Sequence, residues 1–431
     1  MPPGFANIPD HSGRNFMRVA HVLRKYNPGE WGGTETAVKR LFEGLKRHQV
    51  ECVAYCPVIA DRSDRDPLLE GGFEVKRFKA CIPVWGISAQ QRASLIAVGG
   101  NLLSFHALGA LLFEKNLSLI HAHTHNRLGG VALTVARLRG VPFVVTIHGG
   151  ILDLPRAAHE HLLKPLKGGF EWGKLFGFAF GSRRVLPEAD AIMTCNQTEA
   201  ALLREKFPKK RVIVQPHGVP ADEYETDCRA AAREAFPAIV GKELLVSIGR
   251  IDTVKNQHWL VEQAGCIFQR HRNAILVLAG ACTDAAYGKS IEREVARSGL
   301  GDRVLLLGGL PPGDPRLIGL FQEAKASILP SQSEPFGLVI LESWAAGTPV
   351  ISSRTSGAVD LIKPGETGWL FDLDQPAAFH EAVDDALGNQ ARTRRMGEAG
   401  QAFVRMQYGT EVLAARMKAV YESLIRERRT R

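Results

Sequence analysis

The repeated alternation of short apolar runs with helical patterns constrains this fold more than any other feature of the sequence. An apolar run at 17–23 leads into a turn that contains Gly32 and Gly33, and a helical pattern follows at 34–46. Similar apolar runs follow at 50–55, 117–122, 142–147 and 189–195, with helical stretches at 129–138 and 198–206. Strands that alternate with helices in this way predict an α/β domain built on a parallel sheet.

The same alternation restarts after a break near residue 220. The pattern weakens after Pro216 through the charged stretch 222–234, and an apolar run returns at 244–248. Further strands are expected at 274–278, 303–307, 326–329, 349–352 and 368–371. The sequence therefore predicts a second doubly wound domain, which also suits a chain of 431 residues, too long for a single core.

Composition narrows the class of protein. Hydrophobic residues at 45% and charged residues at 23% are ordinary for a folded globular chain. The first 14 residues hold no apolar region of signal-peptide type, which predicts a cytoplasmic protein. The seven cysteines are dispersed without a C-x-x-C pair, which argues against a disulfide framework and against structural zinc.

Two further features bear on partners. The net charge of +9 is compatible with nucleic acid, an anionic membrane surface or phosphorylated ligands, but no nucleic-acid-binding signature accompanies it, so we expect no nucleic-acid partner. The uncharged stretch 93–113 has the length of a membrane span. Because Asn101, His106 and the pair Gly99-Gly100 interrupt it, a packed helix of the first domain is the preferred interpretation.

The most informative segment, at 330–350, reads P-S-Q-S-E-P-F-G-L-V-I-L-E-S-W-A-A-G-T-P-V. A strand ends there, and a helix opens near Gly337, whose N-terminus would direct unpaired N–H groups at an anion such as a diphosphate. Glu342 would sit roughly 6 Å along the helix axis, while Glu334 precedes the helix. The two carboxylates therefore reach different parts of one ligand, as the paired hydroxyls of a ribose and a hexose require.

Either glutamate alone would be interpreted as a capping charge or a solvated helix residue. Their spacing, with the flanking Pro-Phe-Gly and Ala-Gly-Thr-Pro, resembles the E-x7-E motif of glycosyltransferase family 4. That family comprises retaining enzymes of GT-B fold, in which two Rossmann-like domains face each other across a cleft. The resemblance implies that Glu342 binds the ribose of a nucleotide-sugar donor, and that Glu334 and the backbone of Phe336, Gly337 and Leu338 bind its sugar.

A second part of the resemblance lies at the start of the second domain. Gly249-Arg250 at a strand end, with Lys255 five residues on, is similar to the diphosphate-binding cations of the family. Arginine offers a planar fork and lysine a mobile point charge, which together would neutralise a departing nucleoside diphosphate. Alone, such a pair would be a solvated surface feature, and its order and spacing before Glu334 favour a functional site.

The first domain contributes two weaker candidates for ligand-binding positions. The turn that ends at Gly33 would bring backbone amides close to a phosphate, although a Gly-Gly turn alone means little. The sequence T-I-H-G at 146–149 ends a strand at the same crevice, and the resemblance implies that His148 contacts the transferred sugar near its reacting carbon. A structural histidine is the alternative.

His121, His123 and His125 alternate along the end of a strand, so their side chains can share a face and imitate a metal site. The resemblance argues against a metal, because GT-B enzymes generally need none, and it implies no cofactor besides the donor. A structural or acceptor-side role for these histidines is the favoured interpretation.

The resemblance covers nearly the whole chain, from Met17 to a C-terminal helix indicated by the apolar spacing at 413–424. In GT-B folds that helix crosses back to the first domain. We therefore assign residues 1–220 and 406–431 to an acceptor-binding domain and 221–405 to a nucleotide-sugar-binding domain. Two departures leave the donor open: Q-P-H-G at 215–218 replaces the commoner Pro-Asn-Gly, and S-G-A-V-D at 356–360 replaces a Gly-Gly with a later Glu.

The segment 164–184 mixes aromatic residues with five lysines and arginines. Such a composition suits peripheral contact with an anionic membrane. Its glycines make a continuous helix doubtful, and aromatics that pack beneath an acceptor-side loop are the favoured alternative.

The resemblance implies a retaining enzyme that moves a hexose from a nucleotide-sugar donor to a carbohydrate or lipid-linked acceptor, as in polysaccharide, lipopolysaccharide or glycolipid synthesis. It would act in the cytoplasm or at the inner face of the membrane. Catalytic roles fall to His148, Arg250, Lys255 and Glu334. No residue is an obvious covalent nucleophile, so front-face attack is the working hypothesis. A GT-B epimerase, a phosphorylase and a non-catalytic binding subunit are the alternatives, and the two glutamates with two cations disfavour the last.

Overall fold

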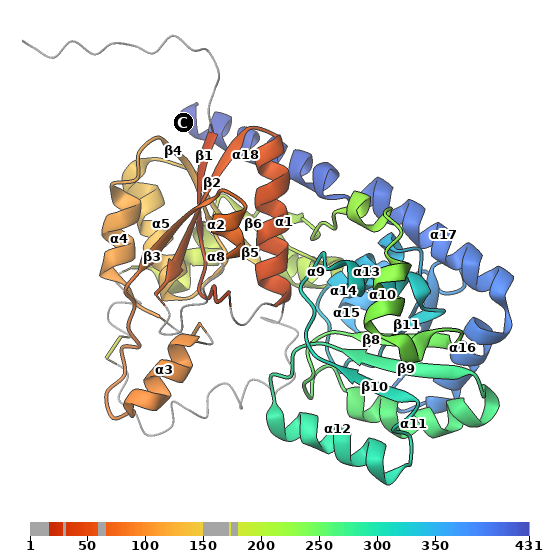
Figure 1. Cartoon of the computed structure of the whole chain (residues 1–431). Helices are drawn as coiled ribbons and strands as arrows, with labels where there is room; N and C mark the ends of the chain where they lie inside the picture. The colour runs from red at the N-terminus through yellow and green to blue at the C-terminus, as the bar shows by residue number, and fades with distance from the viewer. Residues whose placement is uncertain are drawn as a thin grey trace, which may run out of the picture.

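A computed structural model describes residues 17–28, 32–58, 66–97, 99–100, 102–149, 172–173 and 180–430. They form two α/β domains, each built on one parallel sheet (Figure 1). The long helices α17 (Gln390–Gln407) and α18 (Thr410–Arg429) run along the second domain and back to the first.

The first sheet has seven parallel strands in the order β3-β2-β1-β4-β5-β6-β7. Its strands are β1 (Met17–Val22), β2 (Val50–Pro57), β3 (Glu74–Phe78), β4 (Leu117–Ala122), β5 (Phe143–Ile147), β6 (Ala191–Thr194) and β7 (Val212–Val214). The helices are α1 (Gly33–Arg47), α2 (Pro67–Glu70), α3 (Ala89–Ala97), α4 (Phe105–Leu112), α5 (Arg127–Arg139), α8 (Val185–Glu188) and α9 (Gln197–Lys206). The strand order reverses between β1 and β4, where doubly wound sheets bind ligands.

The second sheet has six parallel strands in the order β10-β9-β8-β11-β12-β13. Its strands are β8 (Glu243–Ile248), β9 (Ala274–Ala279), β10 (Val304–Leu307), β11 (Ala326–Leu329), β12 (Val350–Ser353) and β13 (Gly368–Phe371). The helices are α10 (Arg229–Ala235), α11 (Gln257–Arg270), α12 (Ala285–Arg297), α13 (Pro315–Glu323), α14 (Leu338–Ala345), α15 (Ser356–Leu361) and α16 (Pro376–Gly388). Here the strand order reverses between β8 and β11.

The doubly wound α/β fold expected from the sequence is confirmed, and every expected strand is present within one or two residues of its predicted ends. The edge strands β3 and β7 were not predicted. The single helix expected across 93–113 is wrong, because α3 ends at Ala97 and α4 begins after Ser104, whose side chain caps it by accepting a hydrogen bond from the Ala107 N–H. None of the described helices is long and apolar enough to cross a membrane.

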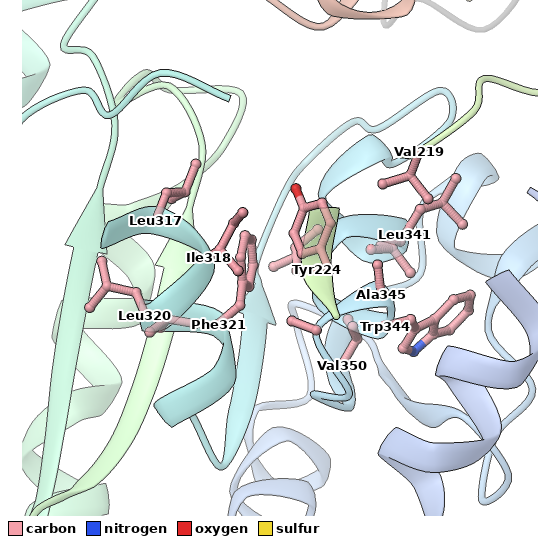
Figure 2. Packing of buried hydrophobic residues seen from close by; sticks show 14 of the residues in the cluster. Val219, Tyr224, Leu317, Ile318, Leu320, Phe321, Leu341, Trp344, Ala345 and Val350 are labelled. Atoms are coloured by element: carbon pink, nitrogen blue, oxygen red, sulfur yellow. The ribbon is translucent and has the colours of Figure 1, made fainter. Parts of the chain in front are cut away.

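Apolar side chains cover both faces of each sheet. Figure 2 shows one cluster of the second domain, in which residues of α13, α14 and β12 pack with Val219 and Tyr224 from the connection between the domains. Trp344 is fully buried in this cluster, and its indole N–H donates to the Thr367 carbonyl at 2.8 Å. Gly400 lets α17 approach it, because a Cβ at that position would lie 2.5 Å from Cδ1 of Trp344.

The helix α18 belongs to the packing of the first domain, although it follows the second domain in the chain. Its residues Ala414, Met417, Tyr421 and Leu424 are buried in the same cluster as Phe42 of α1. The two connections between the domains lie side by side, since the Val219 N–H donates to the Tyr408 carbonyl at 2.9 Å and the Thr410 N–H donates to the Val219 carbonyl at 3.1 Å.

Candidate active site

The candidate site lies where the carboxyl ends of the two sheets meet. His123 and His148 follow β4 and β5 of the first sheet, and Gly249 and Pro330 follow β8 and β11 of the second. The domains touch here, because the Asn196 side-chain amide donates to the Pro335 carbonyl at 2.7 Å. Loops at the carboxyl ends of parallel strands are the usual ligand-binding positions in such sheets, so this junction of the two domains is the natural place for a shared ligand.

Glu334 is held at the N-terminus of α14 by two groups. Its Oε1 accepts a hydrogen bond from the Gly337 N–H at 3.1 Å, and its Oε2 is ion-paired with Nζ of Lys255. Gly337 has a φ of +90°, a conformation that favours glycine, and α14 begins directly after it. Glu334, Lys255 and the amide of Gly337, the N-cap of α14, thus form one polar cluster.

Arg250 lies on the turn after β8 that also carries Lys255, but its side chain is directed at Asp252. Its side chain is half exposed and reaches Oδ2 of Asp252 at 3.2 Å, while Oδ1 of Asp252 accepts from the Lys255 N–H at 3.0 Å. Asp252 therefore organises the turn that carries both expected cations. Asp252 was not among the residues predicted from the sequence, although its position between Arg250 and Lys255 is a signal for such a role.

Glu342 is not a solvated helix residue, the interpretation that it would receive in isolation. It is buried, and its Oε1 accepts from the guanidinium of Arg40 at 2.6 Å. Arg40 comes from α1 of the first domain and also reaches the Gly218 carbonyl at 3.4 Å. Although burial lowers the pKa of Arg40, the neighbouring Glu342 raises it above its ordinary value. Nothing in the local sequence of α1 pointed to this partner.

Gly33, at the end of the expected phosphate-binding turn, faces the start of α14, while residues 29–31 of that turn lie outside the described residues. Gly33 is the first residue of α1, and a Cβ on it would lie 3.8 Å from Cδ1 of Leu338. Gly149 lies still closer to the second domain, since a Cβ there would be 2.2 Å from Cβ of Pro335. Both glycines therefore lie where the two halves of the expected donor site approach each other.

A set of closely packed histidines leads from the first sheet to the loop before α14. Nδ1 of His123 lies 2.7 Å from Nε2 of His148, the His148 ring stacks on His217 with centroids 5.2 Å apart, and His217 packs edge-on against Phe336 at 4.9 Å. Burial, followed by the charges of His217 and Arg24, holds the pKa of His148 well below its usual range. His148 is therefore neutral near pH 7 and can accept a hydrogen bond or donate one.

The histidine group differs from the one that the sequence alternation indicated. His121 and His123 gather with His21 of β1, and one nitrogen from each lies within 4.8 Å of the others. His125 is not part of this group. His121 is tied to the core instead, with Nδ1 at 2.6 Å from the Tyr421 hydroxyl and Nε2 at 2.6 Å from the Thr146 hydroxyl. A cavity of about 30 Å³, room for about one water molecule, is lined by His121, His148, His217 and Arg40.

The segment 164–184, expected to contact either membrane or a covering loop, lies outside the described residues except for 172–173 and 180–184.

These two facing α/β domains, each built on a doubly wound parallel sheet, have the GT-B architecture expected from the sequence. The sequence matches two known families. Residues 32–218 match the glycosyl transferase 4-like domain, and residues 229–403 match glycosyl transferases group 1. Together these matches span most of the chain. The protein belongs to the group 1, or family 4, glycosyltransferases, as the E-x7-E spacing predicts.

Similar proteins agree with this assignment. The D-inositol 3-phosphate glycosyltransferase of Corynebacterium urealyticum is 25% identical over 427 residues, which are 95% of this chain and 96% of the relative. The enzyme of that name from Nocardia farcinica is 30% identical over 223 residues, 50% of this chain and 49% of the relative. Among solved structures, Anabaena HepE in complex with UDP-glucose superposes with a TM-score of 0.70 at 18% identity, covering 94% of this chain and all of that one.

Proposed function

We propose that this glycosyltransferase moves a hexose from a nucleoside diphosphate to an acceptor bound by the first domain, with retention of anomeric configuration. The observation that carries the proposal is the pairing of Lys255 with Glu334 at the N-terminus of α14, opposite Gly149. A cation, a carboxylate and a helix N-terminus are the groups that a diphosphate and its adjoining sugar require. That HepE binds UDP-glucose supports a nucleotide-sugar donor.

The donor would bind chiefly to the second domain. Lys255 and a reoriented Arg250 would neutralise the diphosphate, Glu334 and the backbone at 336–338 would bind the sugar, and Glu342 would bind the ribose. Preorganised groups of this kind stabilise the charge that grows on the leaving diphosphate. The acceptor hydroxyl would attack the anomeric carbon on the face that the diphosphate leaves, and its proton would pass to the departing phosphate oxygen.

His148 would approach the transferred sugar from the first domain. As a neutral ring it can exchange a hydrogen bond with a sugar hydroxyl without placing a second positive charge beside the reacting carbon. Retention by front-face attack has a direct check: the anomeric configuration of the product, measured by proton NMR, must equal that of the donor. A trapped covalent glycosyl-enzyme would refute the mechanism.

We propose a carbohydrate or lipid-linked acceptor. Because the curated relatives are named D-inositol 3-phosphate glycosyltransferases, an acceptor screen has to include that phosphorylated cyclitol beside oligosaccharides and polyprenyl-linked sugars. Peripheral contact with an anionic membrane is a further proposal, supported by the exposed aromatic side chains of Trp85, Phe105 and Phe113 on the first domain. Co-sedimentation with anionic but not neutral vesicles is the expected result.

We also propose that transfer needs no metal and no cofactor besides the donor. Turnover measured with and without EDTA tests this directly, and loss of turnover on chelation that added Mg²⁺ or Mn²⁺ restores would contradict it.

The experiment that tests the donor site is thermal unfolding with a panel of nucleoside diphosphates and nucleotide sugars. A ligand that binds only the folded protein raises the midpoint of unfolding. One member of the panel is expected to stabilise the wild type but not the Arg250→Ala/Lys255→Ala variant. If no member stabilises the wild type, the donor site is misassigned and a non-catalytic binding role becomes the better explanation. Sugar-nucleotide conversion without acceptor would instead indicate an epimerase.

A further inference from the structure

Three histidines form a line from the core of the first domain, where His21 and His123 are buried, to His148 at the carboxyl end of β5. Nδ1 of His21 lies 3.0 Å from Nε2 of His123, and Nδ1 of His123 lies 2.7 Å from Nε2 of His148. The two outer nitrogens of this line, Nε2 of His21 and Nδ1 of His148, are buried and have no hydrogen-bond partner among the described residues. The line therefore consists of two hydrogen bonds with one unpartnered nitrogen at each end.

The protonation of this line is restricted by its geometry. Burial is the largest cause that holds the pKa values of His21, His123 and His148 well below the usual range, so each ring is neutral near pH 7 and carries one N–H. A hydrogen bond between two ring nitrogens needs one N–H and one bare nitrogen. His123 cannot donate to both neighbours without becoming a buried cation, and it cannot accept from both without losing its only N–H.

His123 must therefore donate to one neighbour and accept from the other. It follows that all three rings carry the proton on the same nitrogen, either Nδ1 throughout or Nε2 throughout. In the first state Nδ1 of His148 offers an N–H, and in the second it offers a lone pair. The hydrogen-bonding character of His148 is thus shared by the whole line and is not a property of that residue alone.

We propose that His123, supported by His21, is a positioning residue for glycosyl transfer, because it fixes the ring orientation and the tautomer of His148. The inference rests on the proposed function in one respect, the contact of His148 with the transferred sugar. The partner that holds the second nitrogen of a functional histidine determines which nitrogen is protonated and how the ring is oriented. Here that partner is a second histidine.

The line of histidines also contacts the second domain through His217. His148 stacks on His217 at an interplanar angle of 22°, and His217 meets Phe336 edge-on at 79°. Phe336 follows the proposed sugar-binding Glu334 by two residues. A tilt of the His148 ring after loss of His123 would therefore disturb the loop that faces the donor sugar.

A metal ion held by His21, His121 and His123 is the competing explanation for this group. Of their six ring nitrogens, five already have partners: Nδ1 of His21, both nitrogens of His121 and both nitrogens of His123. Only Nε2 of His21 is unpartnered among the described residues. Metal binding would have to break several of these hydrogen bonds, so the structure favours the line.

The first test needs no ligand and is independent of the proposed function. Long-range proton–nitrogen correlation NMR on protein labelled with ¹⁵N-histidine distinguishes the Nδ1–H and Nε2–H tautomers of each ring. Single-histidine variants assign the signals to individual rings. His21, His123 and His148 are expected to show the same tautomer. Different tautomers in any two of them, or equal mixtures, would overturn the inference. So would one equivalent of zinc in the purified protein that is lost in His21→Phe.

The second test concerns the role in catalysis. His123→Phe removes both hydrogen bonds, whereas the shorter amide side chain introduced by His123→Asn can still reach the position of the original Nδ1 and keep the contact with His148. His123→Phe should mix the tautomers of His148 and lower kcat by about tenfold to a hundredfold, typical for losing the partner of a functional histidine. His123→Asn should retain more of kcat and a single His148 tautomer.

His121→Gln is the matched control, because His121 is equally buried and stacks on His123 with centroids 4.3 Å apart but bonds to Tyr421 and Thr146 instead. It should lower stability without altering the His148 tautomer. If His123→Phe and His121→Gln reduce kcat equally, His123 is only a core residue and the positioning role is wrong. If no donor or acceptor gives turnover, the proposed function fails, while the NMR result still decides whether the three tautomers are coupled.

Discussion

Arg40 and Glu342, which are 302 residues apart in the sequence, form a 2.6 Å ion pair that joins α1 of the first domain to α14 of the second. Their side chains are only 6% and 12% exposed. Because Glu342 is also the proposed ligand of the donor ribose, a bound donor must share this carboxylate with Arg40 or displace it. The contact therefore connects the packing of the two domains with occupancy of the donor site.

Removing one member of this pair should cost more than removing both. Arg40→Met leaves a buried carboxylate without its partner, which typically destabilises a protein by about 3–5 kcal/mol. The Arg40→Met/Glu342→Met variant removes both charges and should recover most of that loss. Urea unfolding measures both values. The double variant should still fail to bind nucleotide, and equal destabilisation of the single and double variants would show that the ion pair is not the cause.

Lys255 should matter for turnover far more than for folding. Lys255→Ala removes the partner of Glu334 and the proposed cation at the diphosphate, so kcat/KM should fall by about a hundredfold to a thousandfold, as for loss of one charge-stabilising group. Lys242→Ala, which removes an exposed lysine next to the opposite end of β8, is the control and should leave kcat/KM unchanged. Similar losses in the two variants would indicate a general charge effect.

Acid should unfold this protein through its histidines. Burial, followed by the charge of Arg40, lowers the pKa of His217 from 6.5 to about 4. Between these pH values the unfolded chain binds a proton that the folded chain does not. The contribution of neutral His217 to the free energy of unfolding is therefore complete above pH 6.5 and is lost as the pH drops towards 4. Each such histidine steepens the loss by up to about 1.4 kcal/mol per pH unit. In urea unfolding at several pH values, His217→Asn should flatten the slope in this window and leave it unchanged above pH 7.

Gly149 should be required for domain contact. A Cβ at Gly149 would meet Pro335 at 2.2 Å, whereas a Cβ at Gly140 would meet nothing within 4 Å. Both residues have a positive φ, +98° and +65°, so alanine is strained at both. Gly140→Ala should therefore lose about 1–3 kcal/mol by thermal unfolding from backbone strain alone, whereas Gly149→Ala should lose more and should also weaken donor binding. Equal donor affinity in the two variants would mean that this contact does not shape the site.

The sequence predicted the sheets well because buried parallel strands are continuous apolar runs. The two missed strands lie at the edges of the first sheet, where β3 reads E-V-K-R-F and β7 has only three residues. Edge strands bear charged side chains and need no continuous apolar run. The helix expected at 93–113 failed because the cap provided by Ser104 begins a new helix inside the uncharged stretch.

The candidate site was predictable where its residues are local in sequence. Glu334 lies just before α14, Glu342 lies within it, and Lys255 follows the end of β8. Their spacing in the sequence is therefore enough to propose them as site residues. Arg40 and His21 act through contacts with residues far away in the chain, and neither lies in a local pattern that distinguishes it from other residues of an amphipathic helix or a buried strand. Such partners emerge only when the fold brings the segments together.

The return of α18 to the first domain has a consequence for synthesis on the ribosome. The apolar face formed by Phe42 and Leu45 is completed by Met417 and Tyr421, which are translated only after the entire second domain. Domains usually fold as they emerge, but this one must wait with part of its apolar surface uncovered. Chaperone capture during translation should therefore concentrate on the first domain and end only when α18 has docked.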